Sequence, residues 1–129
     1  MTFGENLEVP GANIARASAE ISMPEGEPTV NNSGLTPDEV LAVIRANIAQ
    51  PRTCYQELLK RQPDARGKMI VGLTIGVDGR VRTAQVADST INDGLMRGCL
   101  TSKLKSMKFP NPRGEEPVKV QYPFTFAPN

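Results

Sequence analysis

Residues 68–86 read KMIVGLTIGVDGRVRTAQV, and this stretch decides the fold. From Met69 to Val77, apolar side chains occupy every second position, so that one face of the stretch is almost wholly apolar. A period of two is the pattern of a β-strand with one face in a core. The sequence therefore predicts a strand over 68–77.

A turn and a second strand follow directly. Asp78 and Gly79 are residue types that tolerate positive φ, which a type I′ turn requires at both of its central positions. Val81 and Val86 then continue as a strand, although the alternation slips by one residue between them. We expect a β-hairpin with a bulge at residues 82–83.

Helical patterns lie on both sides of this hairpin. Residues 36–39, TPDE, combine a capping hydroxyl, a proline at the first helical position and an acid three residues after the cap. Apolar residues then recur at helical spacing, which predicts a helix over 37–61 with a kink near Pro51. A second apolar stripe predicts a helix that Thr90 or Asn92 caps and that ends before an FPNP run.

A third strand is predicted over 118–126, where apolar and other residues alternate again. The element order α-β-β-α-β makes the second helix a crossover between parallel strands. The fold class is therefore α+β, with a three-stranded antiparallel or mixed sheet in the order 2-1-3 and both helices on one face. Pro123 agrees with an edge position for the last strand, because a sheet tolerates proline at its edge.

The N-terminal quarter has a different character. Residues 1–34 contain glycine and proline at short intervals and no lasting apolar periodicity. This composition is typical of a linker, so we predict a flexible tail over 1–34 and a domain over 35–129. Two short runs, at 7–9 and 19–23, have the extended character of segments that pair with a sheet edge, but the surrounding composition favours disorder.

Composition excludes several function classes. The chain has 15 Lys and Arg against 14 Asp and Glu, so no net field attracts nucleic acid or an anionic membrane. It has no His and only two cysteines, which excludes a Ser-His or Cys-His nucleophile and argues against a zinc site. We find no membrane-spanning run and no signal-peptide pattern. We expect a soluble fragment that is not an enzyme, without cofactor, metal or small-molecule substrate.

Three motifs carry a resemblance to a known family. Residues 78–81 form a D-G-x-V hairpin, residues 86–90 resemble a V-x-x-S-S strand end, and residues 107–110, MKFP, resemble a W-x-F-P exit from a helix. In this order the chain resembles, from about residue 36 to about 127, the C-terminal domain of TonB-type energy transducers. Met107 stands where classical TonB has a tryptophan.

A second group of motifs narrows the resemblance. Within the TonB-like group, the chain is more similar to the AgmX/PglI C-terminal domains of myxobacterial adventurous gliding motility proteins, which are GltJ-like, than to classical TonB. The motifs that carry this similarity are residues 54–57 (CYQE), residues 67–68 (GK), Cys99 and residues 122–126 (YPFTF). The resemblance implies a periplasmic fragment of an inner-membrane-anchored protein. It also implies a motor or transducer complex in the inner membrane, reached through a preceding N-terminal region.

The two cysteines, Cys54 and Cys99, lie on the apolar stripes of the two predicted helices. Three interpretations fit: a redox switch, a pair of buried free thiols, or a disulfide between the helices. The periplasmic compartment that the resemblance implies favours the disulfide.

The resemblance further implies that the edge strand binds a partner by strand addition. TonB-like domains capture an extended TonB-box-like segment of an outer-membrane or periplasmic protein, and main-chain hydrogen bonds supply the affinity. The opposite interpretation is an edge that its proline and lysine protect from aggregation. The alternative function is a static structural or peptidoglycan-binding domain, which would use the basic residues Arg97, Lys103, Lys105 and Lys108. The predicted partner-binding residues are Val118, Lys119, Val120, Gln121, Tyr122, Phe124, Thr125 and Phe126.

Overall fold

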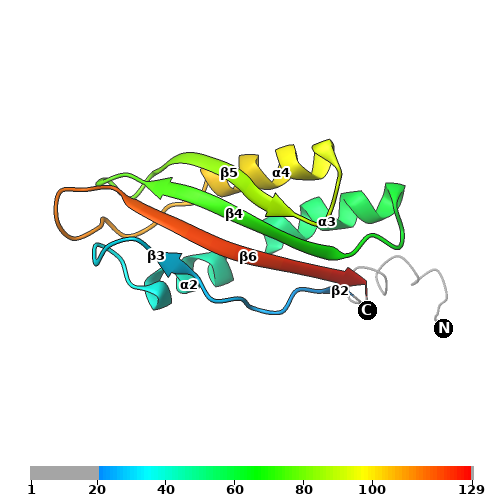
Figure 1. Cartoon of the computed structure of the whole chain (residues 1–129), viewed down its shortest axis with the longest axis horizontal. Helices are drawn as coiled ribbons and strands as arrows, with labels where there is room; N and C mark the ends of the chain where they lie inside the picture. The colour runs from blue at the N-terminus through cyan, green and yellow to red at the C-terminus, as the bar shows by residue number, and fades with distance from the viewer. Residues whose placement is uncertain (1–20, 129) are drawn as a thin grey trace, which may run out of the picture.

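The computed structural model describes residues 21–128 (Figure 1). Residues 1–20, which include the predicted extended run at 7–9, and Asn129 lie outside the described part. Along the chain the elements are β2 (Ile21–Ser22), β3 (Thr29–Val30), α2 (Pro37–Ala46), α3 (Ala49–Arg61), β4 (Gly67–Ile75), β5 (Val81–Ser89), α4 (Gly94–Lys105) and β6 (Val118–Pro128).

Within residues 21–128 the sheet has five strands, and each pair of neighbouring strands is antiparallel. Its order is β2-β6-β4-β5, and β3 also pairs with β6. The three long strands have the relative order that the crossover predicts, with β4 between β5 and β6. The prediction of a three-stranded sheet is wrong, because two short N-terminal strands cover the side of β6 that was expected to be free.

All described helices cover one face of this sheet, as Figure 1 shows with the sheet in front. Alternation along β4 and β6 directs every second side chain toward the helices, and these side chains are buried. The core is therefore a single layer between sheet and helices. Its largest fully buried side chains are Tyr55, Phe109, Phe124, Phe126, Leu35, Ile44, Leu58, Met69, Ile75, Met96, Leu100 and Leu104.

The predicted helix over 37–61 is two helices rather than one kinked helix. α2 begins with the predicted capping box at Thr36 and ends at Asn47, whose side-chain amide donates to the carbonyl of Val43. Pro51 lies in the first turn of α3. A proline has no N–H and its ring collides with the carbonyl four residues earlier, whereas the first turn of a helix leaves its N–H groups unpaired anyway. The chain therefore breaks before Pro51.

The hairpin between β4 and β5 has a different turn from the predicted type I′. The Gly79 N–H donates to the Gly76 carbonyl, and the Gly76 N–H donates to the Arg80 carbonyl, so the loop spans residues 76–80. Gly79 has a φ of 83°, as in turns that end in a left-handed glycine. The bulge near residues 82–83 is confirmed by a register shift there, and a second shift occurs between Val86 and Asp88.

Replacement of Gly79 by alanine should destabilise the fold. The added Cβ would lie 2.2 Å from the Phe109 carbonyl oxygen, and the positive φ disfavours any side chain. We expect the free energy of unfolding to fall by about 2 kcal/mol or more in urea denaturation. Gly98→Ala is the matched control, because nothing lies within 4 Å of its Cβ position and alanine favours a helix by up to about 1 kcal/mol. Equal effects of the two substitutions would contradict this role for Gly79.

A disulfide between Cys54 and Cys99 joins α3 to α4, as predicted. The two Cα atoms lie 5.7 Å apart, and 45 positions separate the cysteines in sequence. Cys54 is buried, and Cys99 is partly buried against the core. The N-terminus of α4 is capped by Asp93, whose carboxylate accepts from the Met96 N–H, rather than by the predicted Thr90 or Asn92.

Candidate partner-binding edge

β6 presents two different faces along its length. Val118, Val120, Tyr122, Phe124 and Phe126 point into the core and are at most 2 % exposed. The intervening residues face away from the helices, where Lys119 and Gln121 are exposed and Pro123 and Thr125 are half-buried. Five of the eight predicted partner-binding residues are therefore core residues, whose side chains are not available to a partner.

Residues 21–34, which we call the strap, run along the outer side of β6 (Figure 1). Ile21–Ser22 pair with Pro128 and Ala127, and Thr29–Val30 pair with Gln121 and Val120. The predicted boundary at residue 35 therefore falls after a segment that pairs with the sheet. The predicted edge at 118–126 is only partly free: the chain's own strap pairs with Val120 and Gln121, whereas residues 122–126 have no strand partner on this side within the described chain.

The C-terminal end of the strap is fixed by polar contacts. The Asn31 N–H donates to the Lys119 carbonyl at 3.1 Å, and the Asn31 side-chain oxygen accepts from the Lys119 N–H at 2.8 Å. The Asn32 side-chain amide donates to the carbonyl of Pro117 at 3.1 Å. Arg113 donates to the Gly34 carbonyl from both its backbone N–H and its guanidinium. Hydrogen bonds to β6 and to the loop before it thus hold this end of the strap.

The same Arg113 holds the start of α2. Its guanidinium donates to both carboxylate oxygens of Glu39, at 3.0 and 2.7 Å, while Glu39 also accepts from the Thr36 N–H. The Arg113 hydrogen bonds, together with the Thr36 N–H, lower the pKa of Glu39 from its usual 4.5 to about 2. Arg113, in the loop before β6, therefore joins the end of the strap to the start of α2.

This low pKa predicts how stability depends on pH. Because the pKa of Glu39 is lower in the folded chain than in the unfolded one, its stabilising effect is present above pH 4.5 and is lost as the pH falls toward 2. Glu39→Gln should flatten the decline of the urea midpoint across this window. Asp38→Asn, a charge removal one residue away, is the control and should keep the wild-type decline. An unchanged decline in Glu39→Gln would refute the assignment.

The middle of the strap crosses β6 at a glycine. The Gly26 N–H donates to the Tyr122 hydroxyl at 3.0 Å. A Cβ on Gly26 would lie 2.7 Å from both the Cγ and the carbonyl oxygen of Pro123, closer than real Cβ atoms come. Only glycine therefore fits where the strap passes over Pro123.

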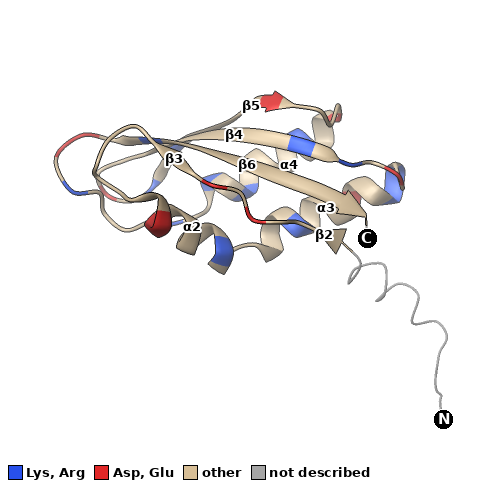
Figure 2. Cartoon of the chain, turned by 60° about the horizontal axis from the view of Figure 1, so that its bottom comes forward, with Lys and Arg blue, Asp and Glu red and all other residues tan. Residues whose placement is uncertain are grey.

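A salt bridge joins the strap to α2. The Arg45 guanidinium donates to both carboxylate oxygens of Glu25, at 2.6 and 2.9 Å, and these hydrogen bonds lower the pKa of Glu25. Figure 2 shows acidic positions in the segment between β3 and β2. Beneath this segment lies a pocket of about 110 Å³, lined by the strap, α2 and β6, with Leu41, Ile44, Ile48 and Phe124 among its apolar walls.

Between its two short pairings the strap leaves β6 without a strand partner. Within the described chain, residues 122–126 of β6 pair with β4 on one side and with no strand on the other. The sequence predicted this edge but not Glu25, Gly26 and Arg45, which lie in a glycine-rich tail or on an exposed helix position. Nothing in the local sequence marks them, because their roles arise only when distant segments meet.

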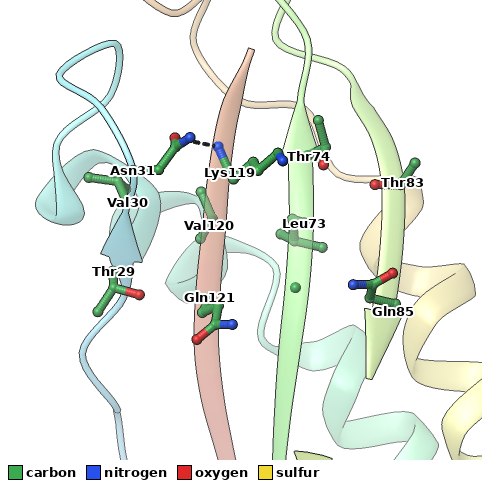
Figure 3. A pocket seen from close by; sticks show the side chains of 11 residues that line it. Thr29, Val30, Asn31, Leu73, Thr74, Thr83, Gln85, Lys119, Val120 and Gln121 are labelled. Atoms are coloured by element: carbon green, nitrogen blue, oxygen red, sulfur yellow. Dashed lines mark hydrogen bonds between the residues drawn. The ribbon is translucent and has the colours of Figure 1, made fainter. Parts of the chain in front are cut away.

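The sheet face opposite the helices holds a shallow hollow of about 410 Å³ (Figure 3). It forms over Gly72, which has no side chain and stands in register between Gln85 and Gln121. Its lining is otherwise mainly hydroxyl and amide groups, with Lys119 as the cation. The hollow extends the edge region toward β5, as far as Thr83 and Gln85.

The described residues contain no group of three or more side chains suited to hold a metal ion. None of the helices within residues 21–128 is long and apolar enough to cross a bilayer. The alternative function, peptidoglycan binding, would use four basic residues. Of these, Arg97, Lys105 and Lys108 are exposed and Lys103 is half-buried.

Comparison with known proteins gives a match to a solved structure but to no family model or curated protein. Among solved structures, the chain is similar to the solution structure of the Helicobacter pylori TonB C-terminal domain, residues 179–285 of that protein. The likeness covers 89 % of this chain and 94 % of the other, at 19 % identity and a TM-score of 0.54. At this identity the likeness shows the fold, which is that of a TonB C-terminal domain.

Proposed function

We propose that this chain is a non-catalytic protein-interaction module that receives an extended segment of a partner along β6. The observation that carries the proposal is the outer side of β6. There, among the described residues, the strap pairs with Val120, Gln121, Ala127 and Pro128 and bonds the Lys119 main chain through Asn31, while no strand pairs with residues 122–126. Unpaired main-chain groups at a sheet edge accept another strand. The TonB-like fold supports the same use.

Strand addition at this edge requires the strap to leave. Each of its two pairings is two residues long, and its salt bridge joins side chains that are half or more exposed. Such short pairings and exposed ion pairs are individually weak. A longer partner strand that pairs with 120–127 would replace them with a longer ladder, which lacks only the hydrogen bond that Pro123 cannot donate.

The fold also supports a cellular role. As a TonB-like domain, the module belongs in the periplasm, at the end of an inner-membrane-anchored protein that transmits force to an outer-membrane or periplasmic partner. The Cys54–Cys99 disulfide fits an oxidising compartment. The cysteine and aromatic motifs similar to the AgmX/PglI domains favour gliding motility over iron transport as the process that this module serves.

A disulfide lock tests the function. Dodecapeptides are selected from a random phage library on the native chain and then measured on the double variant Val30→Cys, Val120→Cys, whose residues are paired across strap and β6. We expect the oxidised lock to reduce peptide affinity at least about tenfold, because the strap can no longer leave. Thr83→Cys paired with Thr74→Cys, on the β4–β5 side, is the control lock and should leave affinity unchanged.

The pairings in both locks are verified by disulfide mapping, with Cys54–Cys99 intact. Equal affinity for the locked and native chains would rule out displacement of the strap. Binding of peptidoglycan fragments alone, with no peptide recovered, would favour the static alternative instead.

A further inference from the structure

The strap occupies a groove, and its contacts describe what that groove accepts. The groove lies between α2 and β6 and is the site of the proposed function, on which this inference rests. Three consecutive strap features meet it: a half-buried Met23, an acid at Glu25 and a glycine at Gly26. Each feature meets a different chemical group of the groove.

The first is apolar. Met23 packs against the core at the pocket of about 110 Å³ that Leu41, Ile44 and Phe124 help to line. Met23 is itself one wall of this pocket, so apolar space stays open beside its flexible thioether. The groove thus offers one shallow apolar socket at this position.

The second is ionic. Arg45 presents its fork to both oxygens of Glu25, a geometry that a carboxylate satisfies and an amide or a cation does not. Lys119 and Arg45 are basic groups beside the strap, and Asp38 is on the same helix as Arg45. The ion pair therefore discriminates by charge at a single position.

The third is steric. Over Pro123 the strap backbone approaches so closely that a Cβ would collide with a main-chain oxygen as well as with the ring. The Tyr122 hydroxyl accepts the N–H of the residue that passes there. This crossing admits glycine and excludes residues with side chains.

We propose that the groove between α2 and β6 selects extended partner segments in which an acidic residue immediately precedes a glycine, and that the strap is its internal occupant. The partner is a protein segment whose apolar residue, acid and glycine match those of the strap. A tethered occupant has an effective concentration of about millimolar, so a partner must exceed the strap in length of pairing or in local concentration.

The test uses the full chain with its strap released by Gly26→Val. The probe is a fluorescent peptide of residues 20–33 with the native sequence, and binding is followed by anisotropy. We expect the peptide to bind the Gly26→Val chain at least about tenfold more tightly than the native chain, whose groove is filled. Gly98→Ala, in an open part of α4, is the control and should behave as the native chain does.

Selectivity is measured with two altered peptides. Glu25→Lys in the peptide should weaken binding by about fivefold or more, and Gly26→Val in the peptide by about tenfold or more. A chain that carries Gly26→Val and Arg45→Glu should reverse the first preference and bind the Glu25→Lys peptide better. Reversal distinguishes recognition by Arg45 from a change in folding, since both chains share the same released strap.

The outcomes separate the two proposals. If the altered peptides bind as tightly as the native one, the edge accepts strands but the inferred selectivity is wrong. If no peptide binds although hydrogen exchange shows the strap amides released, the proposed function fails as well. If the strap amides stay protected in Gly26→Val, glycine is not required at the crossing and the inference is overturned. Dimers formed by exchange of straps would appear as concentration-dependent mass and would also contradict it.

Discussion

The double substitution Cys54→Ala, Cys99→Ala is expected to lower the free energy of unfolding by about 4 kcal/mol, since the disulfide closes a long loop in the unfolded chain. For a domain of this size that is a large part of a total of about 5–15 kcal/mol. The bond joins α3 to α4, which otherwise meet only through side-chain packing and a few polar contacts. The measurement is urea denaturation of both proteins without reductant.

The single variant Cys99→Ala is the control for this prediction. It breaks the same cross-link but leaves the buried Cys54 side chain in place, so its loss should come close to that of the double variant. A loss below about 1 kcal/mol in both would show that the cross-link does not restrict the unfolded chain as expected.

Tyr55→Ala is expected to lower the free energy of unfolding by a similar amount, about 3–5 kcal/mol, because it removes a fully buried ring. The ring lies on α3, 4.9 Å from the ring of Phe126 near the end of β6, and its hydroxyl donates to the Ala65 carbonyl. Burial also raises the pKa of this hydroxyl. The substitution would leave a cavity beside Phe126, near the end of β6.

Tyr55→Phe separates packing from hydrogen bonding. It keeps the ring but removes the hydroxyl, and we expect a loss of about 1 kcal/mol. Urea denaturation measures both variants. Similar losses for Tyr55→Phe and Tyr55→Ala would mean that the hydrogen bond, rather than the packed ring, carries the effect.

Local sequence was enough for the elements that depend on neighbouring residues. The alternation after Met69 predicted β4, and the hydroxyl, proline and acid of residues 36–39 predicted the start of α2. The crossover rule then gave the relative order of the three long strands. These features need only side-chain period, caps and chain connectivity.

Two local predictions, the kink near Pro51 and the type I′ turn at residues 78–79, are wrong because each sequence pattern is compatible with more than one backbone conformation. The pattern around Pro51 predicts a kink, but proline also fits the first turn of a new helix, which is where α3 places it. Asp78-Gly79 predicts a type I′ turn, although the same pair also fits the longer loop of residues 76–80. The choice between such solutions depends on what the turn packs against, here the carbonyl of Phe109.

The strap was missed for a different reason. Its composition is that of a linker, and its order comes from contacts with residues about 90 positions away, such as Asn31 with Lys119 and Gly26 with Tyr122. The run at 19–23 was recognised as able to pair with an edge, but local composition outweighed it. Long-range pairing of a short polar segment has no periodic signal in the sequence.

The central claim is that partners bind at β6 by taking the place of the strap, and backbone amide spectra of the isotope-labelled chain test it most directly. On titration with the phage-selected peptides, we expect the amides of Tyr122 and of residues 124–126 to shift. The amides of Ile21, Ser22, Thr29 and Val30 should move to random-coil positions at the same peptide concentrations. Shifts confined to the outer edge of β5 or to the lysines of α4, with the strap amides unchanged, would contradict the claim.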